Sequence, residues 1–137
     1  MRKIIVIISL LTILLTLVGG AITCKSSPLL TTDESTVRAY ADPATEMALQ
    51  GLSENNLAKY TQYGNSEFKA AVTQEILDKT ATQISDQLGA YESKDFLSID
   101  ERDGYIIVHY KANYAKGEVG IRMVFDKDHL IAGQWFE

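Results

Sequence analysis

The sequence predicts an α+β domain with N-terminal helices followed by a four-stranded antiparallel sheet. Two patterns predict this fold class. Apolar residues recur at helical spacing in two segments before residue 90, and after it they alternate with polar residues in segments separated by turn residues. Helices first and consecutive strands afterwards are typical of an α+β fold. A chain of 137 residues has room for one ordinary domain.

The first helical stripe begins at Val37 and continues through Met47 to Leu52. Asp42-Pro43 either starts this helix or kinks a longer one, because proline suits the first turn of a helix and disturbs its interior. Residues 53–56 end the stripe, and residues 57–60 add a short helical turn that ends near Gly64.

The clearest helix begins after Thr73, whose side chain suits an N-cap, and ends at Gly89. Its apolar stripe repeats at spacings of four, three and four residues: Leu77, Ala81, Ile84 and Leu88. One amphipathic helix cannot bury such a stripe alone, so the stripe predicts a sheet that receives it.

The strands are predicted from alternation and from the turns between them. Arg102-Asp103-Gly104 is typical of a hairpin turn, and Ala115-Lys116-Gly117 and Asp126-Lys127-Asp128 supply the other two. In the second strand alternation places Ile106, Val108, Tyr110 and Ala112 on one face. The expected strands are 91–101, 105–114, 119–125 and 130–136.

The N-terminus has the layout of a secretory signal. Residues 1–23 contain Arg2 and Lys3, a long apolar run and no acidic residue, and they end in small residues before Cys24. Without them the chain keeps 18 acidic and 11 basic side chains, a net charge of −7. An acidic chain lacks the clustered cations of a nucleic-acid surface, so no nucleic-acid partner is expected.

Cys24 is the only cysteine, so the chain cannot form an internal disulfide. Its place after the apolar run resembles the lipobox of prokaryotic lipoproteins, where this cysteine is lipidated. Two alternatives remain open: an uncleaved anchor formed by the 20 or so residues before Cys24, or cleavage after Ala21 and secretion. The expected organisation is a signal or anchor at 1–23, a linker at 24–35 and one domain at 36–137, held on the outer face of the cell membrane.

Val124-Phe125-Asp126, followed by a polar turn and the segment 130–136, resembles the last hairpin of nuclear-transport-factor-2-like and cystatin-like domains. Together with Leu88-Gly89-x-Tyr91, residues 36–137 are similar to the domain of unknown function 3887 family. The resemblance implies a helical layer on a curved sheet that forms a cone with an apolar pocket. It implies no catalytic residues. Members occur as exported lipoproteins and also ahead of α/β-hydrolase domains, whose Gly-x-Ser-x-Gly motif is absent from this sequence.

Aromatic and methionine side chains are the candidates for a ligand pocket. The expected lining consists of Met47, Tyr110, Met123 and Trp135, all placed toward the interior by strand or helix parity. Such a lining suits a small apolar ligand held by a few polar contacts. The same positions also suit an ordinary core, and that interpretation stays open.

The ionisable residues give little indication of a catalytic site. Asp95 shares its strand parity with Leu97 and Ile99 and is the one candidate for an acid in the pocket, whereas His109 is expected to point outward and His129 to lie in a turn. The spacing of these residues does not match a metal site, and no cofactor is expected. Arg122 and Val124 share the outer face of the sheet, which suggests a surface for a protein partner.

The sequence therefore predicts an extracytoplasmic, membrane-tethered domain that binds a small ligand or a protein and has no enzymatic activity. The alternative is a small enzyme of the isomerase, dehydratase or hydrolase kind on the same fold, which requires an ionisable group inside the pocket. The oligomeric state stays open.

Overall fold

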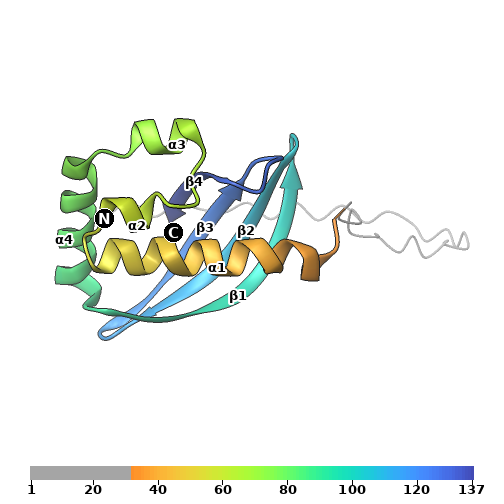
Figure 1. Cartoon of the computed structure of the whole chain (residues 1–137). Helices are drawn as coiled ribbons and strands as arrows, with labels where there is room; N and C mark the ends of the chain where they lie inside the picture. The colour runs from red at the N-terminus through yellow and green to blue at the C-terminus, as the bar shows by residue number, and fades with distance from the viewer. Residues whose placement is uncertain (1–31) are drawn as a thin grey trace, which may run out of the picture.

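The computed structural model describes residues 32–137. The expected leader at 1–23, Cys24 and the expected linker as far as residue 31 lie outside the described residues. Within 32–137, four helices precede four strands, which form one antiparallel sheet in the order β1-β2-β3-β4. The α+β fold and the order of its elements are confirmed, and α1 lies along one face of the curved sheet (Figure 1).

The sequence left open whether the first helix starts at Asp42-Pro43 or is a longer helix that contains this pair. α1 (Glu34–Ser53) is the longer helix, with Pro43 inside it. It begins two residues before the expected domain start, because Asp33 caps it by accepting a hydrogen bond from the backbone of Thr36 at 3.3 Å. Its buried face is made mostly of small and aliphatic residues: Val37, Ala41, Ala44, Ala48, Leu49 and Leu52. Met47 lies beside this face and is half-buried.

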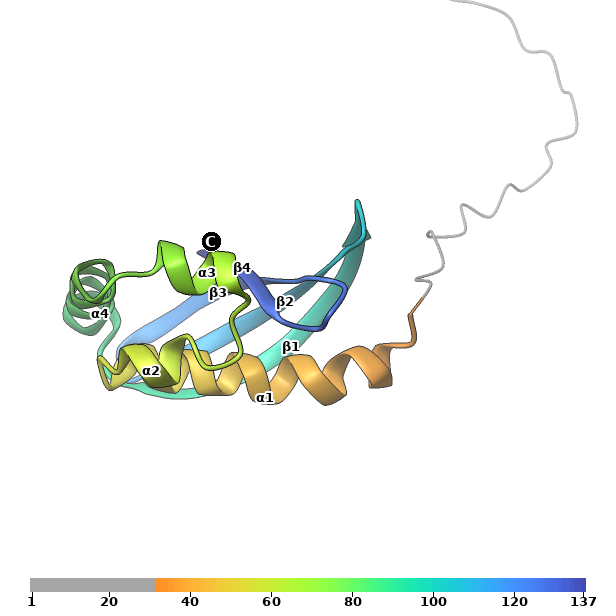
Figure 2. The same cartoon turned by 45° about the horizontal axis from the view of Figure 1, so that its top comes forward.

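Three shorter helices follow (Figure 2): α2 (Leu57–Tyr60), α3 (Ser66–Ala71) and α4 (Gln74–Leu88). α3 is a helix that the sequence did not predict, since six residues are too few for a periodic pattern. Thr73 and Gly89 cap α4 as expected, and Leu77 is its one fully buried residue. No helix within residues 32–137 is long and apolar enough to cross a membrane.

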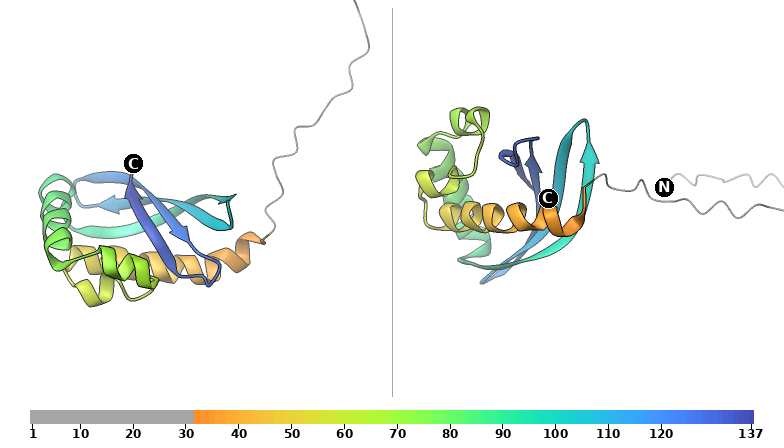
Figure 3. Two further views of the ribbon diagram at one scale, coloured as in Figure 1. Left: turned by 90° about the horizontal axis from the view of Figure 1, so that it is seen from above. Right: turned by 45° about the vertical axis from the view of Figure 1, so that its right-hand side comes forward.

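The strands are β1 (Tyr91–Arg102), β2 (Tyr105–Tyr114), β3 (Gly117–Phe125) and β4 (Ile131–Phe136). Positive φ angles of 54° at Asp103 and 80° at Gly104 make the β1–β2 turn the tight hairpin that the sequence predicted. The two views in Figure 3 show the sheet curving around α1, with α4 across one end.

The inner face of the sheet, which packs on α1, carries the core. Its fully buried members are Val108, Tyr110, Ala112, Ile121, Met123, Phe125 and Ile131. Phe125 meets the ring of Tyr40 edge-on, with centroids 5.4 Å apart. The alternation predicted for the second and third strands is thus confirmed.

A register shift between Phe96 and Ser98 changes the parity of β1. Leu97 is bulged outward and is 57% exposed, while Phe96 packs against the core instead. Because an extra residue moves every following side chain to the other face, Asp95 and Ile99 lie on opposite faces of the sheet. The parity expected for Asp95 and Leu97 was wrong.

Another register shift, between Val124 and Phe125, gives β4 one extra residue, Ala132, opposite β3. Ile131 faces the core, but Trp135 pairs with Arg122 on the outer face and is 46% exposed. The inward orientation expected for Trp135 was wrong, because alternation counted from Ile131 ignores the bulge. The indole ring instead covers Gly133, where a Cβ atom would collide with it.

Candidate functional site

The structure does not bring the four expected pocket residues together. Tyr110 and Met123 lie on the inner face, 1% and 0% exposed, and fill space within the core. Met47 is half-buried on α1, and Trp135 lies on the opposite face of the sheet. A cleft of about 690 Å³ in the described part of the chain is lined by none of these four residues.

Tyr110, on β2, belongs instead to a polar cluster between α1 and the strands β1 and β2, which we call the α1–β1 seam. Its hydroxyl donates a hydrogen bond to Asp42 Oδ1 at 2.8 Å, and Arg38 Nη2 lies 3.2 Å from Asp42 Oδ2. Burial and the bond to Asp42 raise the pKa of Tyr110 well above its usual value. The phenol is therefore a neutral donor that holds α1 to the sheet.

A second tyrosine–carboxylate pair continues the seam. Tyr91 donates to Glu46 Oε2 at 2.8 Å, and Lys94 Nζ lies 3.7 Å from the same oxygen and 5.2 Å from the ring centroid of Tyr110. Burial, and then the hydrogen bond to Glu46, raise the pKa of Tyr91 as well. Both phenols stay protonated at neutral pH, so the seam offers hydrogen bonds and fixes α1 in place.

Two of the other ionisable candidates, Asp95 and His109, lie on the outer face of the sheet, and the third, His129, lies in a turn. Asp95 is exposed and sits 3.8 Å from Lys111 Nζ. His109 points away from the core, as expected, and its Nε2 lies 3.2 Å from Asp100 Oδ2. His129, in the β3–β4 turn, has φ 62° and stacks on the ring of Tyr40 at 4.1 Å. These side chains come from separate places and do not share a cavity.

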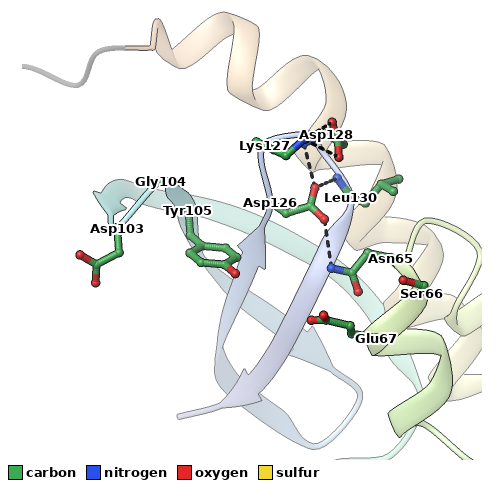
Figure 4. A pocket seen from close by; sticks show the side chains of 10 residues that line it. All are labelled: Asn65, Ser66, Glu67, Asp103, Gly104, Tyr105, Asp126, Lys127, Asp128 and Leu130. Carbon is green, nitrogen blue, oxygen red and sulfur yellow. Dashed lines mark hydrogen bonds and ion pairs between the residues drawn. The ribbon is translucent and has the colours of Figure 1, made fainter.

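The main cleft lies where three chain reversals meet (Figure 4). Its volume is about 690 Å³, which falls within the usual range for small-ligand sites. The start of α3, the β1–β2 turn and the β3–β4 turn form its walls. They contribute Asn65, Ser66, Glu67, Asp103, Gly104, Tyr105, Asp126, Lys127, Asp128 and Leu130.

Asp126 builds one wall of the cleft. Its Oδ1 accepts hydrogen bonds from the backbone N–H groups of Asp128 and Leu130, at 2.9 and 3.0 Å, and its Oδ2 accepts one from Asn65 Nδ2 at 3.0 Å. Burial alone would raise the pKa of Asp126, but the bonds from Asn65 and the two backbone groups lower this pKa below its usual value. This carboxylate therefore stays charged and ties the β3–β4 turn to α3.

Three further carboxylates belong to the lining of the cleft. Glu67 and Asp103 form no ion pair within residues 32–137, whereas Asp128 pairs with Lys127 at 3.3 Å. Tyr105 and Leu130 add apolar surface, 43% and 36% exposed. Four carboxylates and one ammonium group give the cleft a negative charge beside an apolar patch. No group of three metal-binding side chains occurs within residues 32–137.

A smaller cavity lies between α4 and the start of β1. It has a volume of about 120 Å³, enough for a few water molecules. Tyr114 lines it, although the Tyr114 hydroxyl itself is buried without a hydrogen-bond partner within residues 32–137. Its size makes it a poor ligand site next to the main cleft.

Sequence reasoning missed both the cleft and the α1–β1 seam. The acidic residues of the cleft are predicted only as polar turns, since each turn alone is an ordinary solvated loop. Asn65 is the one usable signal, because an asparagine that caps a helix can also reach a neighbouring turn. In the seam, Asp42 and Glu46 are four residues apart on α1 and therefore share one face.

Comparison with known proteins gives the chain a family and a similar fold. A family model described as "Protein of unknown function (DUF3887)" matches residues 46–133. The fold is similar to the NMR structure of a protein from Ruminococcus gnavus ATCC 29149, with a TM-score of 0.53 and 18% sequence identity. The match covers 76% of this chain and 90% of that one. No curated protein matches the chain.

Proposed function

This chain belongs to the DUF3887 family of proteins of unknown function, and we propose that it is a membrane-tethered, extracytoplasmic domain that binds a cationic ligand in its main cleft. The observation that carries the proposal is the cleft itself, with its volume of about 690 Å³ and its mixed lining. The ligand class follows from the charge: unpaired carboxylates favour an amine or a guanidinium group. The exposed Tyr105 ring and Leu130 favour an apolar part next to that charge.

Two sources can present this chemistry, a small amine or the basic side chain of a peptide. Both place a cation beside Glu67 or Asp103, whose carboxylates have no competing ion pair within residues 32–137. Asp126 contributes less to binding, since its oxygens already accept three hydrogen bonds from the protein. Its role is to hold the two walls together.

The alternative of a small enzyme requires an acid or a base inside a pocket. Asp95 and His109 lie on the outer face of the sheet, away from the cleft. Asp42 and Glu46 accept hydrogen bonds from phenols that stay protonated. The geometry therefore supports binding better than catalysis.

Calorimetry on the full chain in a mild detergent tests the cleft. We expect spermidine or tri-lysine to bind and tri-glutamate not to bind. Tighter binding of spermidine would indicate a small amine as the ligand, and tighter binding of tri-lysine would indicate a basic peptide. Removing two charges with Glu67→Gln and Asp103→Asn should weaken binding about tenfold, because each exposed charge contributes roughly 0.5–1 kcal/mol.

The matched control is Asp86→Asn, which removes an exposed carboxylate on α4 outside the cleft. Its affinity for the cation should equal that of the wild type. An equal loss in the control would show that the whole negative surface, and not the cleft, attracts the cation. No binding of either cation would refute the proposed ligand class.

Lipidation of Cys24 provides the tether in this proposal, and Cys24→Ala tests it. In a bacterial host fed an alkyne fatty acid, the wild type should carry the label and sediment with membranes, whereas the variant should carry none. A wild type that sediments without label would indicate that residues 1–23 remain as an anchor. Wild type without label in the soluble fraction would indicate secretion.

A further inference from the structure

The start of α1 and the main cleft lie at the same end of the molecule, where the β1–β2 and β3–β4 turns also lie (Figure 2). Tyr40, in the second turn of α1, stacks on the ring of His129 with centroids 4.1 Å apart. His129 stands between Asp128 and Leu130 in the sequence, and both of these residues line the cleft. Because Tyr40 lies about 10 Å along the helix from Asp33, the chain enters the domain within roughly 20 Å of the cleft wall.

The segment that precedes α1, residues 25–32, has the chemistry that the cleft is proposed to bind. Lys25 is its only charged residue, and Leu29 and Leu30 form an apolar pair a few residues further along. The cleft has the complementary lining, because it holds four carboxylates and one ammonium group beside an exposed tyrosine ring and a leucine. All three expected organisations of the N-terminus leave this segment attached to the domain.

The length of the segment is sufficient for this contact. Eight extended residues span up to about 27 Å, which exceeds the roughly 20 Å between the start of α1 and the cleft wall. Pro28 disfavours a helical conformation at Ser27, and a helix here would shorten the span. The segment joins the domain at the end that carries the cleft, so it reaches the cleft without crossing the core or the sheet.

We propose that residues 25–32 occupy the main cleft of the same chain and exclude its free ligand, a regulation that rests on the binding function proposed above. The Lys25 ammonium group pairs with the carboxylate of Glu67 or Asp103, neither of which has an ion pair within residues 32–137. A tethered group has an effective concentration of the order of 1 mM when its linker matches the span. A free cation therefore has to compete with Lys25 for the same carboxylates.

Apolar contact supports the same placement. Tyr105 and Leu130, which are 43% and 36% exposed, offer the surface on which Leu29 and Leu30 pack. This packing removes apolar area of both partners from water and adds to the charge attraction. A polyamine has no branched apolar group and covers this surface less fully than the segment does.

Zero-length cross-linking of the full chain in a mild detergent tests the contact directly. A carbodiimide joins an ammonium group to a carboxylate that touches it, so mass spectrometry of the monomer band should find Lys25 coupled to Glu67 or Asp103. Excess spermidine should lower the yield of this product. Lys25→Arg is the control, because it keeps the charge but its guanidinium group is not coupled. Coupling of Lys25 only to carboxylates outside the cleft, or to none, overturns the proposal.

Calorimetry with spermidine provides the second readout. Lys25→Gln should bind spermidine about threefold more tightly than the wild type, because the internal competitor is lost. The matched control is Lys116→Gln, which removes an exposed cation in the β2–β3 turn, outside the cleft. Its affinity should equal that of the wild type. Equal tightening in both variants would show a general effect of net charge and overturns the proposal.

These results separate the internal occupant from the binding function on which it rests. Equal binding of spermidine by the wild type and Lys25→Gln, with no cross-link, overturns the internal occupant and leaves the binding function standing. If Lys25→Gln binds no cation at all, the binding function fails. The cross-link alone then decides whether Lys25 lies in the cleft.

Discussion

Replacing Gly51 with alanine is expected to lower the free energy of unfolding by about 3 kcal/mol. In the last turn of α1, a Cβ atom at this position would lie 2.7 Å from Tyr60 Cα and 2.9 Å from the carbonyl carbon of Lys59. Both are backbone atoms of the α2 segment and cannot rotate aside. The usual gain of about 0.5–1 kcal/mol from Gly to Ala in a helix is smaller than this collision.

Urea denaturation followed by circular dichroism measures the loss, and Gly117→Ala is the matched control. A Cβ atom at Gly117 meets only Leu88 Cδ2, at 3.3 Å, the end of a flexible side chain. The control should therefore change the free energy of unfolding by less than about 1 kcal/mol. Equal losses in the two variants would contradict the close approach of α1 and α2.

Phe125→Ala is expected to lower the free energy of unfolding by about 3–5 kcal/mol. The ring is 0% exposed and packs edge-on against Tyr40 at the point where β3 enters the cleft wall. Removing it leaves a cavity between α1 and the sheet. The adjacent Asp126 turn is bonded to α3 through Asn65, which limits how far the sheet can relax into that cavity.

Trp135→Ala is the comparison for Phe125→Ala. Trp135 is the larger side chain, but it is 46% exposed and contacts Arg122 at 4.9 Å from its ring centroid. Its loss should lower the free energy of unfolding by only about 1 kcal/mol. A loss as large as that of Phe125→Ala would mean that Trp135 faces the core after all.

Much of the fold follows from patterns that are regular over several residues. Thr73 and Gly89 bracket α4 because cap chemistry is local. The turn at Asp103-Gly104 forms because both residues tolerate positive φ. Tyr110 and Met123 face inward because alternation is uninterrupted along β2 and β3. Where the pattern is regular, the sequence predicts both the element and its buried face.

The errors in the sheet arise from two register shifts. Leu97 and Ala132 each add one residue that alternation cannot reveal, and each reverses the faces of the residues beyond it. Trp135 looked like a pocket residue for this reason alone. A bulge depends on how two strands pair. The composition of one strand therefore does not show where an extra residue will lie opposite its partner.

The cleft and the seam escape prediction for a different reason. Each joins residues that are distant in the chain: 61 positions separate Asn65 from Asp126, and 68 separate Asp42 from Tyr110. Every member has an ordinary local role as a cap, a turn residue or a helix surface residue. Their shared chemistry appears only when the topology brings those elements side by side.

The bulge at Ala132 lets β4 carry an extra residue without moving any later side chain to the other face of the sheet. Deleting Ala132 would leave the pairs Phe125–Ile131 and Val124–Gly133 adjacent in a regular ladder, with Gln134 still inward and Trp135 still outward. The bulge thus absorbs a difference of one residue in the length of the chain. Natural relatives with and without this residue would therefore keep the same side chains on each face of β4.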